Sequence, residues 1–396
     1  MSTLKIYETM RPSAWPWIFR ASAGAFAPLA CLLLLTTLLA SALPARAGEK
    51  CADGKRDFKT MTANLYIGTG TETITNLNPA DPNYVDELLA AVTGTYYELL
   101  ASQPPLRLQA LADRIAARQP DMVAVEEATL LRVHGNIALS GTTPATEVVY
   151  DYLQILVDSL KARGAHYAVV STSQEWDVEM PMYILGPDGV PTGGDDVRQT
   201  DREAILVRTD LPPGQLRVSH PQSGNFVNVS FQGFPVTRGW CSVDVCFHGE
   251  NFRYLCTHLE EETWPDIQVA QAKELLAGPA KTCLPVVLVG DFNSDPLHRD
   301  RPKGQPTAYP KFLAAGFWDT WALLHPFHPA GGLTWGHDEF LADPSVAFDR
   351  RIDFVFFRGF GFVPLKAEPI DISLGRTEPP LWSSDHAALA AELRIK

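Results

Sequence analysis

Short apolar runs along this chain repeatedly end in a polar residue that can act as a catalyst or a ligand. The alternation of apolar and polar positions predicts strands over residues 58–63, 122–125, 252–257 and 286–290. The residues that directly follow these strands are Asn64, Glu126, Glu127, His258 and Asp291. Because binding and catalytic residues concentrate where a rigid strand passes into a loop, we expect these side chains to gather along one edge of a sheet.

Apolar residues between the predicted strands recur with helical spacing. Leu108, Leu111 and Ile115 precede Pro120, and a second helical pattern over residues 149–160 precedes Gly164. Alternating strand and helix signals predict an α/β chain. Two stretches look inserted and are candidate substrate-specificity loops: residues 68–103, which are polar at first and then weakly helical, and residues 174–199, which are rich in Gly, Pro and Asp.

The amino terminus has the pattern of an export signal. Lys5, Arg11 and Arg20 precede an apolar run that ends in the small-x-small motif of residues 45–47. We therefore expect residues 1–47 to be a cleaved signal peptide of a secreted or periplasmic protein. The alternative is an uncleaved membrane anchor, since the run approaches membrane-spanning length. No second run of that length follows, so we expect no membrane span after cleavage, and residues 48–396 show no composition break that would divide them into two domains.

Charge and cysteine content narrow the possible partners. The formal net charge is −13, and no basic run is visible, which argues against a strong nucleic-acid-binding patch. After signal cleavage five cysteines remain, and their spacing gives no sign of a zinc or thioredoxin-like motif. Cys241 and Cys256 are expected to face one another diagonally across a hairpin that turns at residues 248–251, either as a disulfide or as buried thiols. The five cysteines are Cys51, Cys241, Cys246, Cys256 and Cys283.

The chain offers the residue types that phosphate-ester hydrolysis requires. That reaction needs a cation, a base that generates the attacking hydroxide and donors for the phosphate oxygens. Mg²⁺ prefers oxygen ligands and retains several waters, so Glu127 supported by Asn64 and Asp385 would be sufficient to hold it. Glu126 competes with Glu127 for this role. Taken alone, Asn64 and Asn293 could equally be turn residues.

Six short motifs in a fixed order make the pattern specific. Together they resemble the motif set of the endonuclease/exonuclease/phosphatase superfamily, and they extend from about residue 58 to residue 395. The motifs are Thr62-Ala63-Asn64-Leu65, Pro120-Asp121 through Glu126-Glu127, Thr257-His258-Leu259, Gly290-Asp291-Phe292-Asn293, Arg351-Ile352-Asp353-Phe354 and Ser384-Asp385-His386.

The resemblance implies a role for each of these residues. Glu127 would be the principal ligand of Mg²⁺, or of Mn²⁺ or Ca²⁺, with Asn64 and Asp385 beside it. Asp291 would orient or deprotonate the attacking water, and Asn293 would hold that water or the phosphate. His386 would act on the scissile phosphate while Asp353 fixes its orientation. His258 would be a second imidazole on the phosphate.

The resemblance also implies a DNase I-like fold and a hydrolase. The fold would be a four-layer αββα sandwich of two packed, mostly antiparallel sheets. Two further residues have structural alternatives: Arg202 would clamp a phosphate or form a salt bridge, and Trp335 would line the pocket or only pack.

The sequence leaves the substrate open. We expect a secreted, divalent-metal-dependent phosphodiesterase, and its substrate would be a lipid headgroup, a nucleic acid or a small metabolite. A sphingomyelinase-like enzyme and an extracellular nuclease are the alternatives within this class. The alternative from another class is a binding module that retains the fold without turnover.

Overall fold

The computed structural model describes residues 56–396 except 135–143, 232–234, 300–301, 303 and 346–347. The predicted signal peptide, residues 1–47, and Cys51 therefore lie outside the described residues. No helix in the described residues has both the length and the apolar character needed to cross a bilayer.

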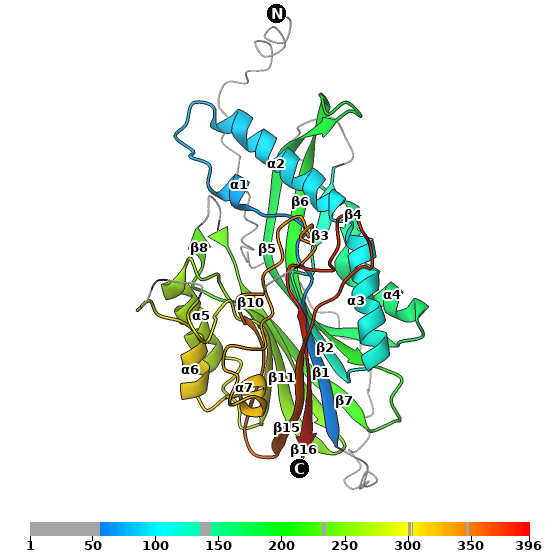
Figure 1. The fold of residues 1–396 in the computed structure, drawn as a ribbon, viewed down its shortest axis with the longest axis vertical. Coiled ribbons are helices and arrows are strands. Elements are labelled where there is room, and N and C mark those ends of the chain that lie inside the picture. Colours follow the sequence, from blue (N-terminus) through cyan, green and yellow to red (C-terminus); the bar gives the residue numbers. More distant parts are fainter. Residues whose placement is uncertain (1–55, 135–143, 232–234, 300–301, 303, 346–347) are drawn as a thin grey trace, which may run out of the picture.

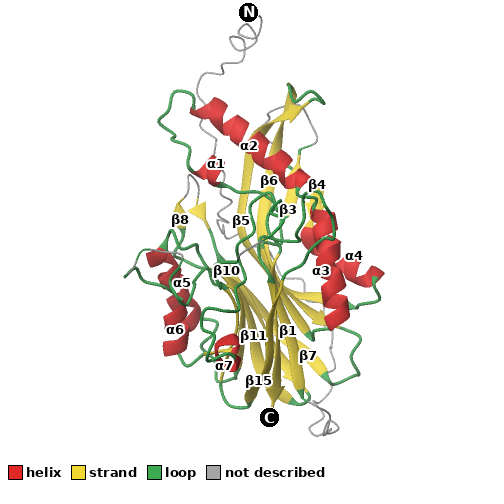
Figure 2. Ribbon diagram, viewed as in Figure 1, coloured by secondary structure: helices red, strands yellow, loops and turns green. Residues whose placement is uncertain are grey.

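The fold has two sheets packed face to face (Figure 2). The larger sheet has eight strands, in the order β15 (Phe362–Ile370), β16 (Ala388–Ile395), β1 (Asp57–Asn64), β2 (Met122–Glu126), β6 (Pro191–Arg208), β3 (Leu130–Val133) and β4 (Glu147–Asp151), with β5 (Tyr167–Leu185) paired to β6. The smaller sheet has six, in the order β13 (Trp318–Asp319), β14 (Asp353–Arg358), β12 (Val286–Asp291), β11 (Glu250–His258), β10 (Gly239–Phe247) and β7 (Leu216–Asn225).

Most strand pairs in both sheets are antiparallel. The parallel pairs among the described strands are β1 with β2 and β11 with β12. A separate two-stranded ribbon joins β8 (Ser230–Phe231) and β9 (Pro235–Val236). The four strands expected from the alternating pattern correspond to β1, β2, β11 and β12, so that part of the prediction is confirmed.

Helices cover the outer faces of the two sheets, which gives four layers in the order helix, sheet, sheet, helix (Figure 1). Helices α3 (Pro104–Arg118) and α4 (Tyr152–Ala162) share one apolar core with the outer face of the eight-stranded sheet. Helices α5 (Pro265–Ala277) and α6 (Tyr309–Ala314) share another with the outer face of the six-stranded sheet, and the short α7 (Thr320–Leu324) follows β13. The expected sandwich architecture is therefore confirmed.

Side chains alternate between two apolar cores along the central strands. In β1, Phe58 points into the core between the sheets, whereas Met61 and Ala63 point toward α3. In β2, Ala124 likewise points into the core between the sheets, and Val125 points into the core shared with α3. The period of two that predicted the strands therefore reflects burial on both faces, with a different layer on each side.

The two stretches that look inserted are mostly regular structure that packs together: the weak helical signal in the first is confirmed by α2, whereas the prediction of the second as a loop was wrong. The first forms α1 (Glu72–Thr75) and α2 (Tyr84–Ala101), and the second forms the far ends of β5 and β6. Figure 1 shows α2 lying across these strand ends. Leu88 and Val92 of α2 share an apolar core with Trp176 and Met180 of β5. We call α2 with the far ends of β5 and β6 the accessory layer.

The predicted hairpin between β10 and β11 is present, with its turn at His248 and Gly249. Cys241 pairs directly opposite Cys256 rather than diagonally. The four described cysteines are free thiols, and Cys241 and Cys256 are fully buried.

Candidate active site

Strand ends from both sheets bring two rows of polar side chains face to face. In the six-stranded sheet, His258 pairs with Asp291 and Asp291 pairs with Asp353 across the adjacent strands β11, β12 and β14. In the eight-stranded sheet, Asn64 ends β1 and His386 lies just before β16. The polar residues expected along one sheet edge therefore lie along two edges that face each other.

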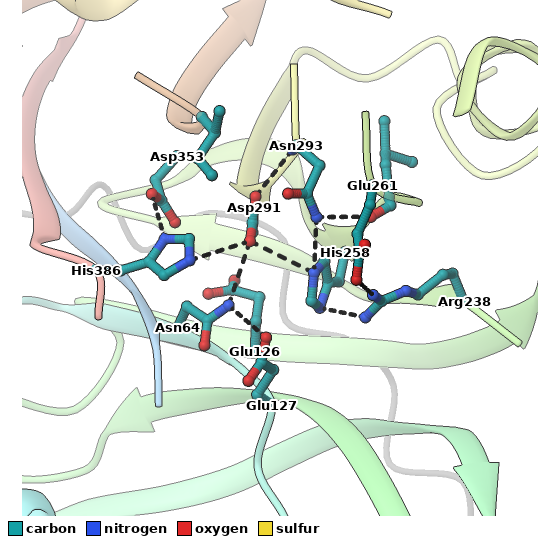
Figure 3. Close-up of polar contacts among 12 residues, drawn as sticks. Asn64, Glu126, Glu127, Arg238, His258, Glu261, Asp291, Asn293, Asp353 and His386 are labelled. Carbon is teal, nitrogen blue, oxygen red and sulfur yellow. Dashed lines mark hydrogen bonds and ion pairs between the residues drawn. The ribbon is translucent and has the colours of Figure 1, made fainter. Parts of the chain in front are cut away.

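Hydrogen bonds connect these two rows (Figure 3). The Nδ2 atom of Asn64 donates to Asp291 Oδ2 at 3.2 Å and to Glu127 Oε1 at 2.9 Å. The Nδ1 atom of His386 lies 2.8 Å from Asp353 Oδ2, and its Nε2 atom lies 3.7 Å from Asp291 Oδ2. Residues more than 300 positions apart in the chain thus share one polar cluster.

The backbone decides which of the two adjacent glutamates faces this cluster. Glu126 continues the alternation of β2 and points between the sheets, where it is fully buried and accepts a hydrogen bond from Thr62 at 2.7 Å. Glu127 has φ of 53°, a left-handed conformation that a glutamate rarely adopts. This turn ends the strand and directs the half-buried Glu127 carboxylate toward Asn64 and the backbone N–H of Ile67.

A tryptophan holds Asp385 in place. The Nε1 atom of Trp335 donates to Asp385 Oδ2 at 3.2 Å, and the Arg350 guanidinium stacks 3.4 Å from the centre of the Trp335 ring. Trp335 also forms a β-bridge with His386. Trp335 therefore positions two of the predicted site residues, which combines the pocket and packing alternatives.

The charge state of His386 is set by the carboxylates around it. Burial alone would lower the pKa of His386, but Asp353, Asp385 and Asp291 outweigh that effect and raise the pKa well above its ordinary value. The ring is therefore an imidazolium at neutral pH, with Nδ1–H directed at Asp353. Its Nε2–H remains available on the side of Asp291.

Asp291 lies where several carboxyl groups crowd together. Burial and the charge of Asp353 raise the pKa of Asp291 to about 8, while the His386 imidazolium opposes the rise. Burial and the charge of Glu127 likewise raise the pKa of Asp385 to about 6, against the same imidazolium. Both shifts follow from several carboxylates sharing a small, dry volume.

A buried arginine fixes the tautomer of His258. Arg238 Nη1 lies 3.0 Å from His258 Nδ1, and a guanidinium can only donate, so Nδ1 accepts and the ring proton lies on Nε2. Burial, Arg238 and His386 lower the pKa of His258 well below its ordinary value, so the ring is neutral. His258 Nε2–H then faces Asp291 Oδ2 at 3.4 Å, whereas Asn293 Nδ2, 3.1 Å from the same nitrogen, is itself a donor and is directed at the Leu259 carbonyl.

Asn293 and Arg202 have different surroundings. Asn293 has φ of 47°, and its backbone N–H donates to Asp291 Oδ1 at 2.9 Å, so it is both a turn residue and a neighbour of the cluster. Arg202 forms an ion pair with Asp151 at 2.6 Å and donates to the carbonyl of Ala128. The salt-bridge alternative describes Arg202, and we do not assign it to substrate binding.

The sequence analysis missed two buried arginines that shape this site. Arg238 lies between Glu260, Glu261, Asp201 and His258, but a single arginine before a strand belongs to no motif. Arg107 of α3 donates to the carbonyls of Leu65, Tyr66 and Ser383, which fixes the loops that carry Asn64 and His386. Its position within an apolar helical face was the available signal, because an arginine there requires buried acceptors.

The donor set of the cluster fits a hard divalent cation. Glu127, Asp291, Asp353 and Asp385 supply carboxylate oxygens, and Asp353 Oδ1 is buried without a hydrogen-bond partner among the described residues. One carboxylate oxygen each from Asp291 and Asp353 and one nitrogen of His386 lie within 4.8 Å of one another, and because the charged ring cannot ligate a metal, only the oxygens are candidate ligands. Several carboxylates near one imidazolium leave negative charge that a cation would balance. Mg²⁺ and Mn²⁺ prefer such oxygen ligands.

The fold and this cluster together define a phosphoester hydrolase, and comparison with known families agrees. The Endonuclease/Exonuclease/phosphatase family matches residues 62–386, so the chain belongs to that family. Its members are hydrolases that act on phosphoester bonds. The matched range contains every predicted site residue.

Solved structures with a similar fold include three from different sources. An endonuclease/exonuclease/phosphatase from Beutenbergia cavernae is 19% identical, with a TM-score of 0.48 and coverage of 86% of this chain and 72% of that chain. The mannosyl-6-phosphatase of Bacteroides thetaiotaomicron is 16% identical, with a TM-score of 0.47 and coverage of 85% and 100%. The catalytic domain of human Nocturnin is 14% identical, with a TM-score of 0.47 and coverage of 87% and 97%. No curated protein sequence matches the chain.

Proposed function

We propose that this protein is an exported phosphodiesterase that requires a divalent cation. The observation that supports it most is the alignment of Asp353, His386 and Asp291, with His386 Nδ1 at 2.8 Å and Nε2 at 3.7 Å from the two carboxylates. An imidazolium fixed in this way can donate a proton from Nε2 to a phosphate oxygen or a leaving group. Asp353 stabilises the charged ring and keeps its orientation.

In this proposal Glu127, Asn64 and Asp385 would hold the cation, which would supply positive charge against the charge that develops on the phosphate oxygens. Asp291 would orient the attacking water and accept its proton in its ionised form, which the neighbouring His386 imidazolium favours. His258 and Asn293 contact the phosphate from the side opposite His386. Arg238 keeps His258 neutral and turns its Nε2–H toward the reacting atoms.

The surroundings of the site favour a substrate of low charge over a polyanion. Gly70 has side-chain oxygens of both Glu72 and Glu339 close to it, each 2.6 Å from where its Cβ would lie. Glu98 and Glu72 raise the pKa of Glu339, after burial, and Glu72 also contributes to the raised pKa of Glu261. We call Glu72, Glu98, Glu261 and Glu339 the acidic rim. Tyr66, which follows the Asn64 strand, donates to the Glu339 carbonyl at 2.7 Å and links the rim to the site.

The proposal extends to location and organisation. Residues 1–47 would be removed on export, and residues 48–396 would act as one catalytic domain in the periplasm or outside the cell. A phospholipid headgroup or a small phosphodiester suits the acidic rim better than DNA or RNA does.

The experiment compares hydrolysis of bis(p-nitrophenyl) phosphate and p-nitrophenyl phosphate with and without Mg²⁺. We expect EDTA to abolish activity, Mg²⁺ or Mn²⁺ to restore it, and the diester to be the better substrate. Full activity in EDTA would contradict the cation requirement. A clear preference for the monoester would contradict the diesterase assignment while leaving the hydrolase class intact.

A further inference from the structure

Two thiols and two carboxylates meet in the dry core between the sheets, beneath the candidate active site. Cys241 of β10 and Cys256 of β11 are paired directly across the six-stranded sheet. Glu126 of β2 and Glu203 of β6 both lie one residue beyond the antiparallel pair Val125 and Ala204, at the same end of that pairing in the eight-stranded sheet. All four side chains have no solvent exposure.

These side chains are close enough to share one ligand. The ligand atoms of Glu203, Cys241 and Cys256 all lie within 4.8 Å of one another. Cys256 Sγ lies 3.3 Å from Glu126 Oε1, which brings in the fourth group. Zinc binds thiolate sulfur at about 2.3 Å and carboxylate oxygen at about 2.0–2.2 Å, so four ligands around it lie within about 4 Å of one another. A small movement of the side chains toward one another is therefore sufficient to bring their ligand atoms to the distances of a zinc site.

Both carboxyl groups of the cluster have an oxygen that is free to bind a ligand. Glu126 Oε2 and Glu203 Oε1 are buried without a hydrogen-bond partner in the described part of the chain. A buried polar atom without a partner is unfavourable, and a bound cation would satisfy both of these oxygens.

We propose that Cys241, Cys256, Glu126 and Glu203 form a closed zinc site that joins the two sheets. Two thiolates and two carboxylates supply the four ligands of a tetrahedral structural site, whereas Mg²⁺ would require six oxygen ligands or waters. Binding releases the two thiol protons and any carboxyl proton to solvent as the chain folds. The cysteine spacing alone gave no sign of this site, because its ligands come from four strands.

The site would position the catalytic groups without touching substrate. Glu126 precedes Glu127, and Cys256 lies two residues before His258. An ion that holds Glu126 and Cys256 together would therefore fix the ends of β2 and β11 relative to each other. This inference does not depend on the proposed reaction, because a structural ion is separable from turnover.

The first test measures the metal content of the full chain by mass spectrometry after dialysis against EDTA. We expect about one zinc ion per chain in the parent. Cys246→Ser is the matched control, since Cys246 lies on β10 like Cys241 but is partly exposed beside Arg217. It should retain the zinc, as should Glu127→Gln, whereas Cys241→Ser and Cys256→Ser should each lose at least nine-tenths of it.

A second measurement on the parent keeps the proposal testable when the cysteine variants do not fold. Protein produced with Co²⁺ in place of zinc should show intense near-ultraviolet absorption from thiolate-to-cobalt charge transfer. Absence of a bound ion, a cobalt form without that band, or zinc retained in Cys241→Ser would each overturn the proposal. An intact mass two hydrogens lower, from a Cys241–Cys256 disulfide, would overturn it as well. Loss of zinc with activity unaffected would leave the proposed function standing.

Discussion

At the scale of single residues, the pair Asp353 and His386 determines which proton the site can move. The 2.8 Å contact holds His386 Nδ1–H on Asp353, so the reactive proton is the one on Nε2. Since the three neighbouring carboxylates keep this ring charged, activity should be lost as the pH rises through the pKa of His386.

Replacing Asp353 with asparagine tests this assignment. The variant removes the negative charge beside the imidazolium, so the pKa of His386 falls. We expect kcat/KM to drop by about 10²–10⁴ and the alkaline limb of its pH profile to move to lower pH. A profile that keeps the parent's alkaline limb would show that His386 is not the acid.

Asp121 provides a separate pH-dependent prediction, about stability. Burial raises the pKa of Asp121 to about 6 from its ordinary 3.8, although the Lys59 N–H donates to it at 2.8 Å. The folded chain therefore binds this proton more tightly than the unfolded chain. The resulting contribution is complete below pH 3.8 and is lost as the pH rises through 6.

The variant Asp121→Asn cannot titrate and should lack this dependence. Relative to the parent, its free energy of unfolding should increase by about 3 kcal/mol between pH 3.5 and pH 7, as measured by urea denaturation. Identical pH dependence in the two proteins would exclude Asp121 as the source.

The sequence predicted residue identities better than residue directions. The order of the motifs grouped the site residues, and the resemblance favoured Glu127 over Glu126 as the cation ligand. The direction of the Glu127 side chain follows from its positive φ, and no residue propensity indicates that backbone conformation. Arg238 could not be found in this way, because its role depends on four neighbours that only the folded chain brings together.

At the scale of elements, the parallel pair β11 and β12 sets the position of two site residues. His258 and Asp291 end these strands opposite each other, and Gly290 lies beside Thr257. Gly290 has φ of 137°, and a Cβ there would lie 1.9 Å from the Thr257 carbonyl oxygen. The backbones can approach this closely only because residue 290 is glycine.

Gly290→Ala should therefore destabilise the protein by more than about 3 kcal/mol and reduce activity, measured by urea denaturation and a diester assay. Gly94 of α2 is the matched control, because nothing lies within 4 Å of its added Cβ. Gly94→Ala should stabilise the protein by about 0.5–1 kcal/mol. Equal effects of the two substitutions would remove the steric argument.

The elements differ in how far the sequence could predict them. Helices α3 and α4 followed from local spacing, although α4 begins at Tyr152, three residues later than the apolar pattern, because Val149 belongs to β4. The accessory layer gave only a weak helical signal in its first half and was expected to form loops. Its two halves stabilise each other across about 90 residues of chain, and such tertiary packing leaves little local periodicity.

At the scale of the whole molecule, net charge and the acidic rim act together on substrate approach. The chain carries a formal charge of −13, and the rim places carboxylates beside the site. Like charges repel over about 30 Å in 0.01 M salt but only about 10 Å in 0.1 M salt.

Cleavage of single-stranded DNA should consequently accelerate several-fold when salt rises from about 0.01 to 0.1 M at constant Mg²⁺. A neutral-headgroup phospholipid should show little change. In the variant Glu339→Gln, salt should accelerate the cleavage of single-stranded DNA less than it does in the parent. A rate on DNA that falls with salt, as for a basic binding surface, would contradict this account.

The central claim is that residues from both sheets assemble one cation-dependent site. The most direct measurement is kcat/KM for bis(p-nitrophenyl) phosphate against Mg²⁺ concentration in the parent, Glu127→Gln and His386→Ala, with melting temperatures as the control for folding. We predict that both variants melt close to the parent and lose about 10²–10⁴ in rate, and that Glu127→Gln also requires more Mg²⁺. Cleavage by both variants at the parent's rate would show that the site lies elsewhere.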